Sequence, residues 1–107
     1  MPAPLVRNFP EIALDNGTTR QVLAESPELM VVAFTFPVDA EGALHNHPHI
    51  QSTYVKSGVF EFTVGDETLT VRAGDSFVIP SGITHGCRAI EAGTLIDTFT
   101  PRRDDFL

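Results

Sequence analysis

All four histidines of this chain lie in two short segments of the sequence. One segment holds His45, His47 and His49, and the other holds His85. Neutral imidazole is the commonest metal ligand in proteins. Side chains two residues apart on a strand point to the same face, so we expect His45 and His47 to bind one ion together. With His85 supplied by a neighbouring strand, the pattern predicts a divalent metal site.

Gln51 is the predicted fourth ligand, because it follows His47 closely and its amide oxygen can bind a metal. Three histidines and a glutamine leave the full positive charge on the ion, whereas a glutamate would neutralise one unit. Such a site is a stronger Lewis acid toward a carbonyl, hydroxyl or carboxylate. The ligand set therefore favours polarisation of a substrate over redox chemistry with oxygen. It leaves nickel, zinc, manganese, iron and cobalt as candidate ions.

Two further residues lie beside the predicted ligands. His49 has the strand parity of the histidine pair, but Pro48 disturbs the strand, so we expect His49 at the rim of the site. Cys87 has the parity of His85 and could face the same cavity. A lone cysteine is more often a small buried apolar residue, so we predict no catalytic role for it.

The last strand-like segment, residues 94–100, carries an unusual charge. Asp97 lies among apolar residues and Phe99 shares its parity, while Arg102 and Arg103 follow a proline. Composition alone favours a simple interpretation, in which Asp97 lies on the solvent face and the two arginines belong to a solvated tail. The alternative places Asp97 and Arg103 inside a site.

The elements that must position these residues are almost all β-strands. Runs of β-branched and aromatic residues alternate with turns roughly every eight to twelve positions, as in sandwiches and barrels. Residues 25–28 are predicted to form a turn, and no stretch has a helical period longer than about two turns. In one run Phe60, Phe62 and Val64 share a face that should be buried. Strands are predicted at 29–36, 52–56, 59–64, 68–72, 76–79, 86–90 and 94–100.

Composition and charge limit the class of protein. Hydrophobic residues make up 42% of the 107 residues, which predicts one globular domain over 1–107. The formal charge of -7 argues against a nucleic-acid surface. No apolar run approaches the ~20 residues of a membrane span, and the first residues lack the apolar core of a signal peptide. Cys87 is the only cysteine, so no internal disulfide can form, and we expect a cytoplasmic location.

The glycines and prolines around the histidines resemble the two motifs of the cupin family. The first motif, over about 42–58, is carried by Gly42, His45, His47, Gln51 and Gly58. The second, over about 74–89, is carried by Gly74, Pro80, Gly82 and His85. Cupins usually have glutamate where this chain has Gln51, and asparagine where it has Ala89. The resemblance implies a double-stranded β-helix, a jelly-roll barrel with the metal at its open mouth.

From about Leu29 to the end, the chain is similar to pectin-degradation cupins of KdgF type. The similarity rests on the histidine-rich run and on the terminal pattern of aspartate, phenylalanine and arginine. In that family the position before the glutamine is often glutamate, so Ile50 predicts a less acidic mouth. The resemblance implies that the metal is held by His45, His47, His85 and Gln51, and that the substrate is handled by Asp97, Phe99 and Arg103.

Members of that family open 4,5-unsaturated uronates from pectin or alginate into linear keto forms. The resemblance thus implies a lyase- or isomerase-type enzyme for an acidic sugar. Arg103 would pair with the carboxylate, Asp97 would act as general acid/base, and Phe99 would exclude water. Two alternatives stay open: an iron- and oxygen-dependent cupin dioxygenase, and a non-catalytic cupin that binds or senses a small ligand. The family also implies a homodimer.

Overall fold

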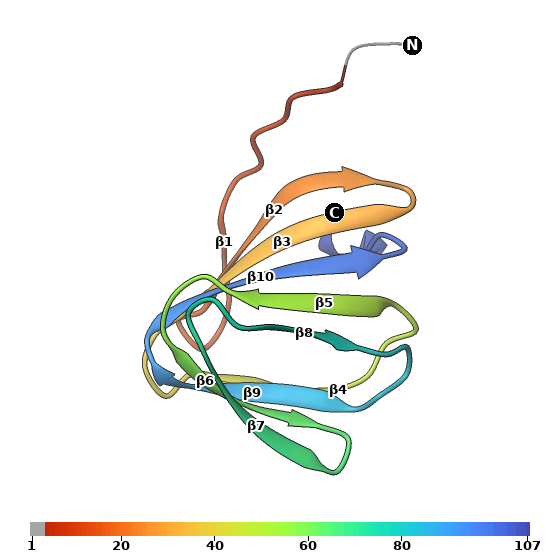
Figure 1. Cartoon of the computed structure of the whole chain (residues 1–107). Coiled ribbons are helices and arrows are strands. Elements are labelled where there is room, and N and C mark those ends of the chain that lie inside the picture. The colour runs from red at the N-terminus through yellow and green to blue at the C-terminus, as the bar shows by residue number, and fades with distance from the viewer. Residues whose placement is uncertain (1–3) are drawn as a thin grey trace.

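The computed structural model describes residues 4–107, which form two antiparallel sheets facing each other (Figure 1). The only helix in this part of the chain is the short 3-10 helix η1 (Asp104–Phe106), and no described helix is long and apolar enough to cross a membrane. The strands are β1 (Ile12–Ala13), β2 (Thr19–Ser26), β3 (Leu29–Phe36), β4 (Glu41–His45), β5 (Ile50–Val55), β6 (Val59–Val64), β7 (Glu67–Arg72), β8 (Ser76–Ile79), β9 (His85–Glu91) and β10 (Gly93–Thr100).

The strand order explains how distant segments meet. The six-stranded sheet has the order β1-β2-β3-β10-β5-β8, and the four-stranded sheet has the order β4-β9-β6-β7. Between β10 and β5, Asp97 is opposite Thr53 and Phe99 is opposite Gln51. Partners across antiparallel strands share a face. All four are buried, so they point to the inner face of the larger sheet.

Apolar side chains form two buried clusters between the sheets. In β6, Phe60 and Phe62 are buried while Glu61 between them is not, which confirms the predicted alternation. Burying one such ring is worth roughly 2–3 kcal/mol. One buried cluster contains Phe36, Ala40, Val55, Phe60, Phe62, Val71, Ala89 and Leu95, and a second contains Val22, Met30, Val32 and Phe99.

The seven predicted strands are present, but sequence analysis missed β1, β2 and β4. In β2 only Val22 is fully buried, and in β4 almost every residue is exposed, so neither shows the alternation that identifies a strand. These strands are held by pairing with β3 and β9 rather than by apolar burial. The turn predicted at 25–28 is confined to Pro27 and Glu28, because β2 continues to Ser26.

Candidate metal centre and its cavity

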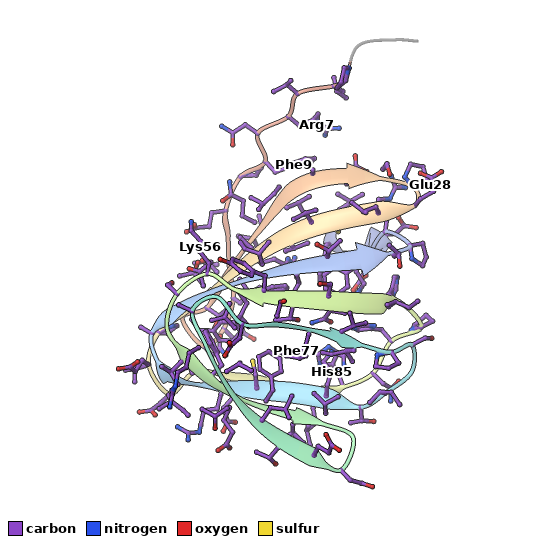
Figure 2. All side chains as sticks on the ribbon, in the orientation of Figure 1. Arg7, Phe9, Glu28, Lys56, Phe77 and His85 are labelled. Atoms are coloured by element: carbon purple, nitrogen blue, oxygen red, sulfur yellow. The ribbon has the colours of Figure 1, made fainter. Side chains whose placement is uncertain are left out.

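Three of the four histidines meet between the two sheets. His45 ends β4 and His85 begins β9, and the two are opposite each other. His47 comes from the loop after β4. The prediction that His45 and His47 lie on one strand is therefore wrong, although the two side chains do meet. The possible ligand atoms of the three lie within 4.8 Å of one another, close enough to hold one ion. Figure 2 shows His85 pointing from β9 into the space between the sheets.

Each of these three rings is oriented by a backbone carbonyl two residues away. The distance from Nδ1 to that oxygen is 2.8 Å for His45, 3.0 Å for His47 and 2.9 Å for His85. A carbonyl oxygen can only accept, so Nδ1 donates and Nε2 of the neutral ring keeps its lone pair. Burial lowers the pKa of His47 and of His85, which favours the neutral form. Metal-binding histidines are commonly oriented in this way.

Glycines bring the histidine-bearing segments together. Gly82 has a positive φ of 78°, a conformation that glycine adopts without steric strain. Its N–H donates to the carbonyl of His47 at 2.9 Å. Gly86 directly follows His85, and a Cβ at Gly86 would lie 2.7 Å from the carbonyl oxygen of Gly42. The close approach of β4 to β9 therefore depends on the absence of a side chain.

Gln51 makes a contact with His47 that a metal would explain. Oε1 of Gln51 lies 3.0 Å from Nε2 of His47, while the amide nitrogen of Gln51 donates to Oγ1 of Thr53 at 3.0 Å. With His47 neutral, both facing atoms are acceptors, so no hydrogen bond joins them. Nε2 of His85 is buried without a partner among the described residues. A divalent cation would satisfy all these lone pairs, so the donor set fits one.

Asp97 is connected to this donor set through Thr53. The hydroxyl of Thr53 donates to Oδ1 of Asp97 at 2.7 Å and accepts from Gln51. Asp97 is only 5% exposed. Burial raises the pKa of Asp97 to about 7, although the hydrogen bond from Thr53 and the charge of Arg103 act in the opposite direction. The solvent-face interpretation of Asp97 is therefore wrong, because its register in β10 turns it inward.

The C-terminal arginines are fixed by carboxylates. Nε and Nη2 of Arg103 donate to the two carboxylate oxygens of Asp105 at 3.0 and 2.8 Å. Arg102 donates to Glu25 of β2 at 2.8 Å. The ring of Phe106 packs edge-on against other aromatic rings of the larger sheet. The end of the chain is thus folded back against that sheet, and the solvated-tail interpretation is wrong.

A cavity of about 260 Å³ lies next to the histidines. Its lining includes three predicted ligands, His45, Gln51 and His85, and the three residues predicted to handle substrate, Asp97, Phe99 and Arg103. The ring of His47 is buried beside it, 5.7 Å from the ring of Phe99. One cavity therefore brings together the side chains that the predicted chemistry requires.

Three neighbouring residues have different surroundings. His49 contributes the carbonyl that orients His47, and it belongs neither to the histidine cluster nor to the cavity lining. Ile50, at the start of β5, is 48% exposed and does not line the cavity, so its effect on the acidity of the mouth stays a prediction. Cys87 does line the cavity, and burial raises the pKa of its thiol to about 12, which keeps it protonated.

Other residues around the site were missed by sequence analysis. Thr53 shares the inward parity of Gln51 in one strand, and that parity was a usable signal. Asp105 follows Arg103 by two residues, but nothing in the sequence shows that the pair is formed. Arg20 lines the cavity from β2, a strand that was not predicted.

Comparison with known proteins supports this description. Residues 32–98 match the cupin domain family. The pectin degradation protein KdgF of Dickeya dadantii (strain 3937) is 38% identical over 96 residues, which cover 88% of this chain and 87% of that protein.

Solved structures give the same result. An RmlC-like cupin from Shewanella frigidimarina NCIMB 400 matches with a TM-score of 0.90 and 39% identity, over 92% of this chain and 89% of that one. KdgF from Halomonas sp. matches with a TM-score of 0.89 and 36% identity, over 94% of this chain and 100% of that one. These similarities confirm the predicted all-β jelly-roll fold.

Proposed function

The chain belongs to the cupin family, and on this basis we propose that it is a metal-dependent enzyme that opens or tautomerises the ring of an unsaturated uronate. Its similarity to two KdgF proteins supports an acidic sugar as the substrate class. The observation that carries the proposal is the hydrogen-bonded chain from Gln51 through Thr53 to Asp97. It holds a buried acid beside both the donor set and the cavity.

The proposed reaction is an isomerisation, so it requires no oxidant and no second substrate. The anomeric hydroxyl loses a proton and the bond from the anomeric carbon to the ring oxygen breaks, which leaves an aldehyde at C1 and an enolate oxygen on C5. The enolate then gains a proton at C4, which leaves a ketone at C5. Asp97 accepts the first proton as a carboxylate and returns it to C4 as an acid. Thr53 holds Oδ1 of Asp97 in place, and Phe99 shields the proton from water.

His45, His47, His85 and Gln51 are the proposed ligands of a divalent ion, which supplies Lewis-acid polarisation of substrate oxygens when bound. This ligand set contains no carboxylate, so it leaves the charge of the ion undiminished. Nickel, zinc, manganese, iron and cobalt remain candidates, because imidazole nitrogen is an acceptable ligand for each.

The test uses purified protein loaded with each of these ions in turn. The substrate is unsaturated galacturonate freshly released by a pectin-cleaving lyase, and loss of the ring enol ether is followed by ultraviolet absorbance and NMR. We expect a rate well above the spontaneous one. Asp97→Asn should lower kcat about 10²–10⁴-fold, the range attributed to general acid–base catalysis.

Asp66→Asn is the matched control, because Asp66 is exposed in the turn between β6 and β7 and should leave kcat unchanged. A wild-type rate no faster than the spontaneous one with every ion, or an unaltered rate in Asp97→Asn, would overturn the proposal. Oxygen uptake in step with substrate loss would indicate a cupin dioxygenase instead. Tight binding of the sugar without turnover would indicate a binding or sensor protein.

The remaining predictions concern the setting of the protein. A homodimer and a cytoplasmic location are proposed from the family and from the composition. Equilibrium sedimentation would test the dimer, and a molecular mass equal to that of one chain would contradict it.

A further inference from the structure

Arg20 occupies an inward position where an apolar residue would be usual. It lies on β2 opposite Phe34 of β3, and partners across antiparallel strands share a face. Val22, two residues further along β2, is buried in the core on that face. Arg20 is itself partly buried, and it lines the same cavity as Asp97.

No carboxylate among residues 4–107 forms a salt bridge with Arg20. The carboxylates of this part of the chain pair with Arg7, Arg88, Arg102 and Arg103. The guanidinium carbon of Arg20 instead lies 4.3 Å from the centre of the Phe106 ring. Stacking on a ring occupies the face of a guanidinium and leaves its in-plane N–H groups for a planar acceptor such as a carboxylate.

Arg103 stacks on the same ring of Phe106, also at 4.3 Å, but one edge of its guanidinium is already occupied. Two of its nitrogens bind the two carboxylate oxygens of Asp105, which is the two-point geometry that a substrate carboxylate would require. A substrate carboxylate could reach Arg103 only at the remaining edge, formed by Nη1 and Nη2, where it would share the cation with the negative charge of Asp105. Within the described part of the chain, Arg20 has no paired carboxylate that a substrate would have to displace.

We propose that Arg20, rather than Arg103, binds the carboxylate of the sugar acid. Arg103, held by Asp105, shapes the cavity together with Phe106. The proposal rests on the proposed function for the class of substrate, but it requires only that an anionic sugar enters the cavity. Since Arg20 and Asp97 line one cavity, a single sugar can place its carboxylate at Arg20 and its reacting oxygens near Asp97.

The test measures binding rather than turnover. Galacturonate and its methyl ester are titrated by calorimetry into metal-loaded wild type, Arg20→Gln, Arg103→Gln and Arg72→Gln, the last a matched control because Arg72 is exposed at the end of β7. Arg20→Gln should weaken the binding of galacturonate about ten- to a hundredfold, the value of a charge-assisted hydrogen bond. Binding of the ester should change little. Arg103→Gln should affect the acid and the ester equally.

Arg20→Lys keeps the charge without the two-point geometry, so it should retain part of the preference for the acid over the ester. If Arg20→Gln does not fold, Arg20→Lys is compared with the wild type in its place. Wild-type affinity for galacturonate in Arg20→Gln, or loss of the preference in Arg103→Gln alone, would overturn the inference. Equal affinity of the wild type for acid and ester would also overturn it. Absence of turnover in the wild type would overturn the proposed function and leave these binding results to decide the role of Arg20.

Discussion

On the wall of the cavity that carries the histidines, the ligand wall, each ring is oriented by a contact within two residues. On the opposite wall, the acid wall, Asp97 is oriented by a contact between strands. Each of the three clustered histidine rings is oriented by a carbonyl two positions away in the chain. On the larger sheet, Asp97 is held by Thr53, which is 44 residues distant. Ring orientation on the ligand wall is therefore local, and the direction of Asp97 on the acid wall depends on strand register.

Substitutions on the two walls should therefore affect metal affinity and activity in different ways. A change on the ligand wall should alter metal affinity directly, because it removes or turns a ligand. A change to Thr53 on the acid wall should act through the hydrogen bonds that orient Gln51 and Asp97, and such outer contacts are typically worth about 10–100-fold in metal affinity or activity.

The largest effect on metal affinity is expected from His85→Ala on the ligand wall. A metal-binding free energy on the order of 10 kcal/mol shared by four ligands makes each worth about a hundredfold in Kd. Competition with a chelator would measure the loss. His49→Ala is the control, because it keeps the carbonyl that orients His47 and removes only a ring outside the cluster. Equal losses in both variants would contradict the proposed ligand set.

A smaller effect is expected from Thr53→Val on the acid wall. Valine keeps the shape but breaks the link from Gln51 to Asp97, so metal affinity and kcat should each fall by about tenfold. Chelator competition and the enol-ether assay would measure them. Thr98→Val, on the alternate face of β10 beside Asp97, is the matched control. If the two valine variants behaved alike, the hydrogen-bonded chain would have no functional role.

The smallest effect is expected from Cys87→Ala. Cys87 lines the cavity, but it belongs neither to the histidine cluster nor to the hydrogen-bonded chain from Gln51 to Asp97. We expect kcat to stay within about twofold, because a thiol held protonated by burial is a poor nucleophile. The free energy of unfolding should fall by about 1 kcal/mol from lost packing, measured by urea denaturation. A large drop in kcat with normal stability would show that the thiol takes part in catalysis.

The same difference between the walls explains what could be predicted from the sequence. The histidines and Gln51 lie in short motifs with glycine and proline, and local spacing is visible in a single chain. The solvent-face interpretation of Asp97 failed because its direction depends on pairing with Thr53 in β5. Arg20 was missed because its inward direction depends on register with Phe34, in a strand without apolar alternation.

The hydrogen bond from Gly82 to the carbonyl of His47 has a further consequence. It joins the loop that follows β4 to the turn that precedes His85, two segments far apart in the chain. The entropic cost of closing the long loop between them therefore arises during folding rather than during metal binding. Preorganisation of this kind raises affinity by lowering the ordering cost of binding. We therefore expect binding of an ion to require only small side-chain adjustments, and we expect the backbone around the histidines to keep its conformation when the ion dissociates.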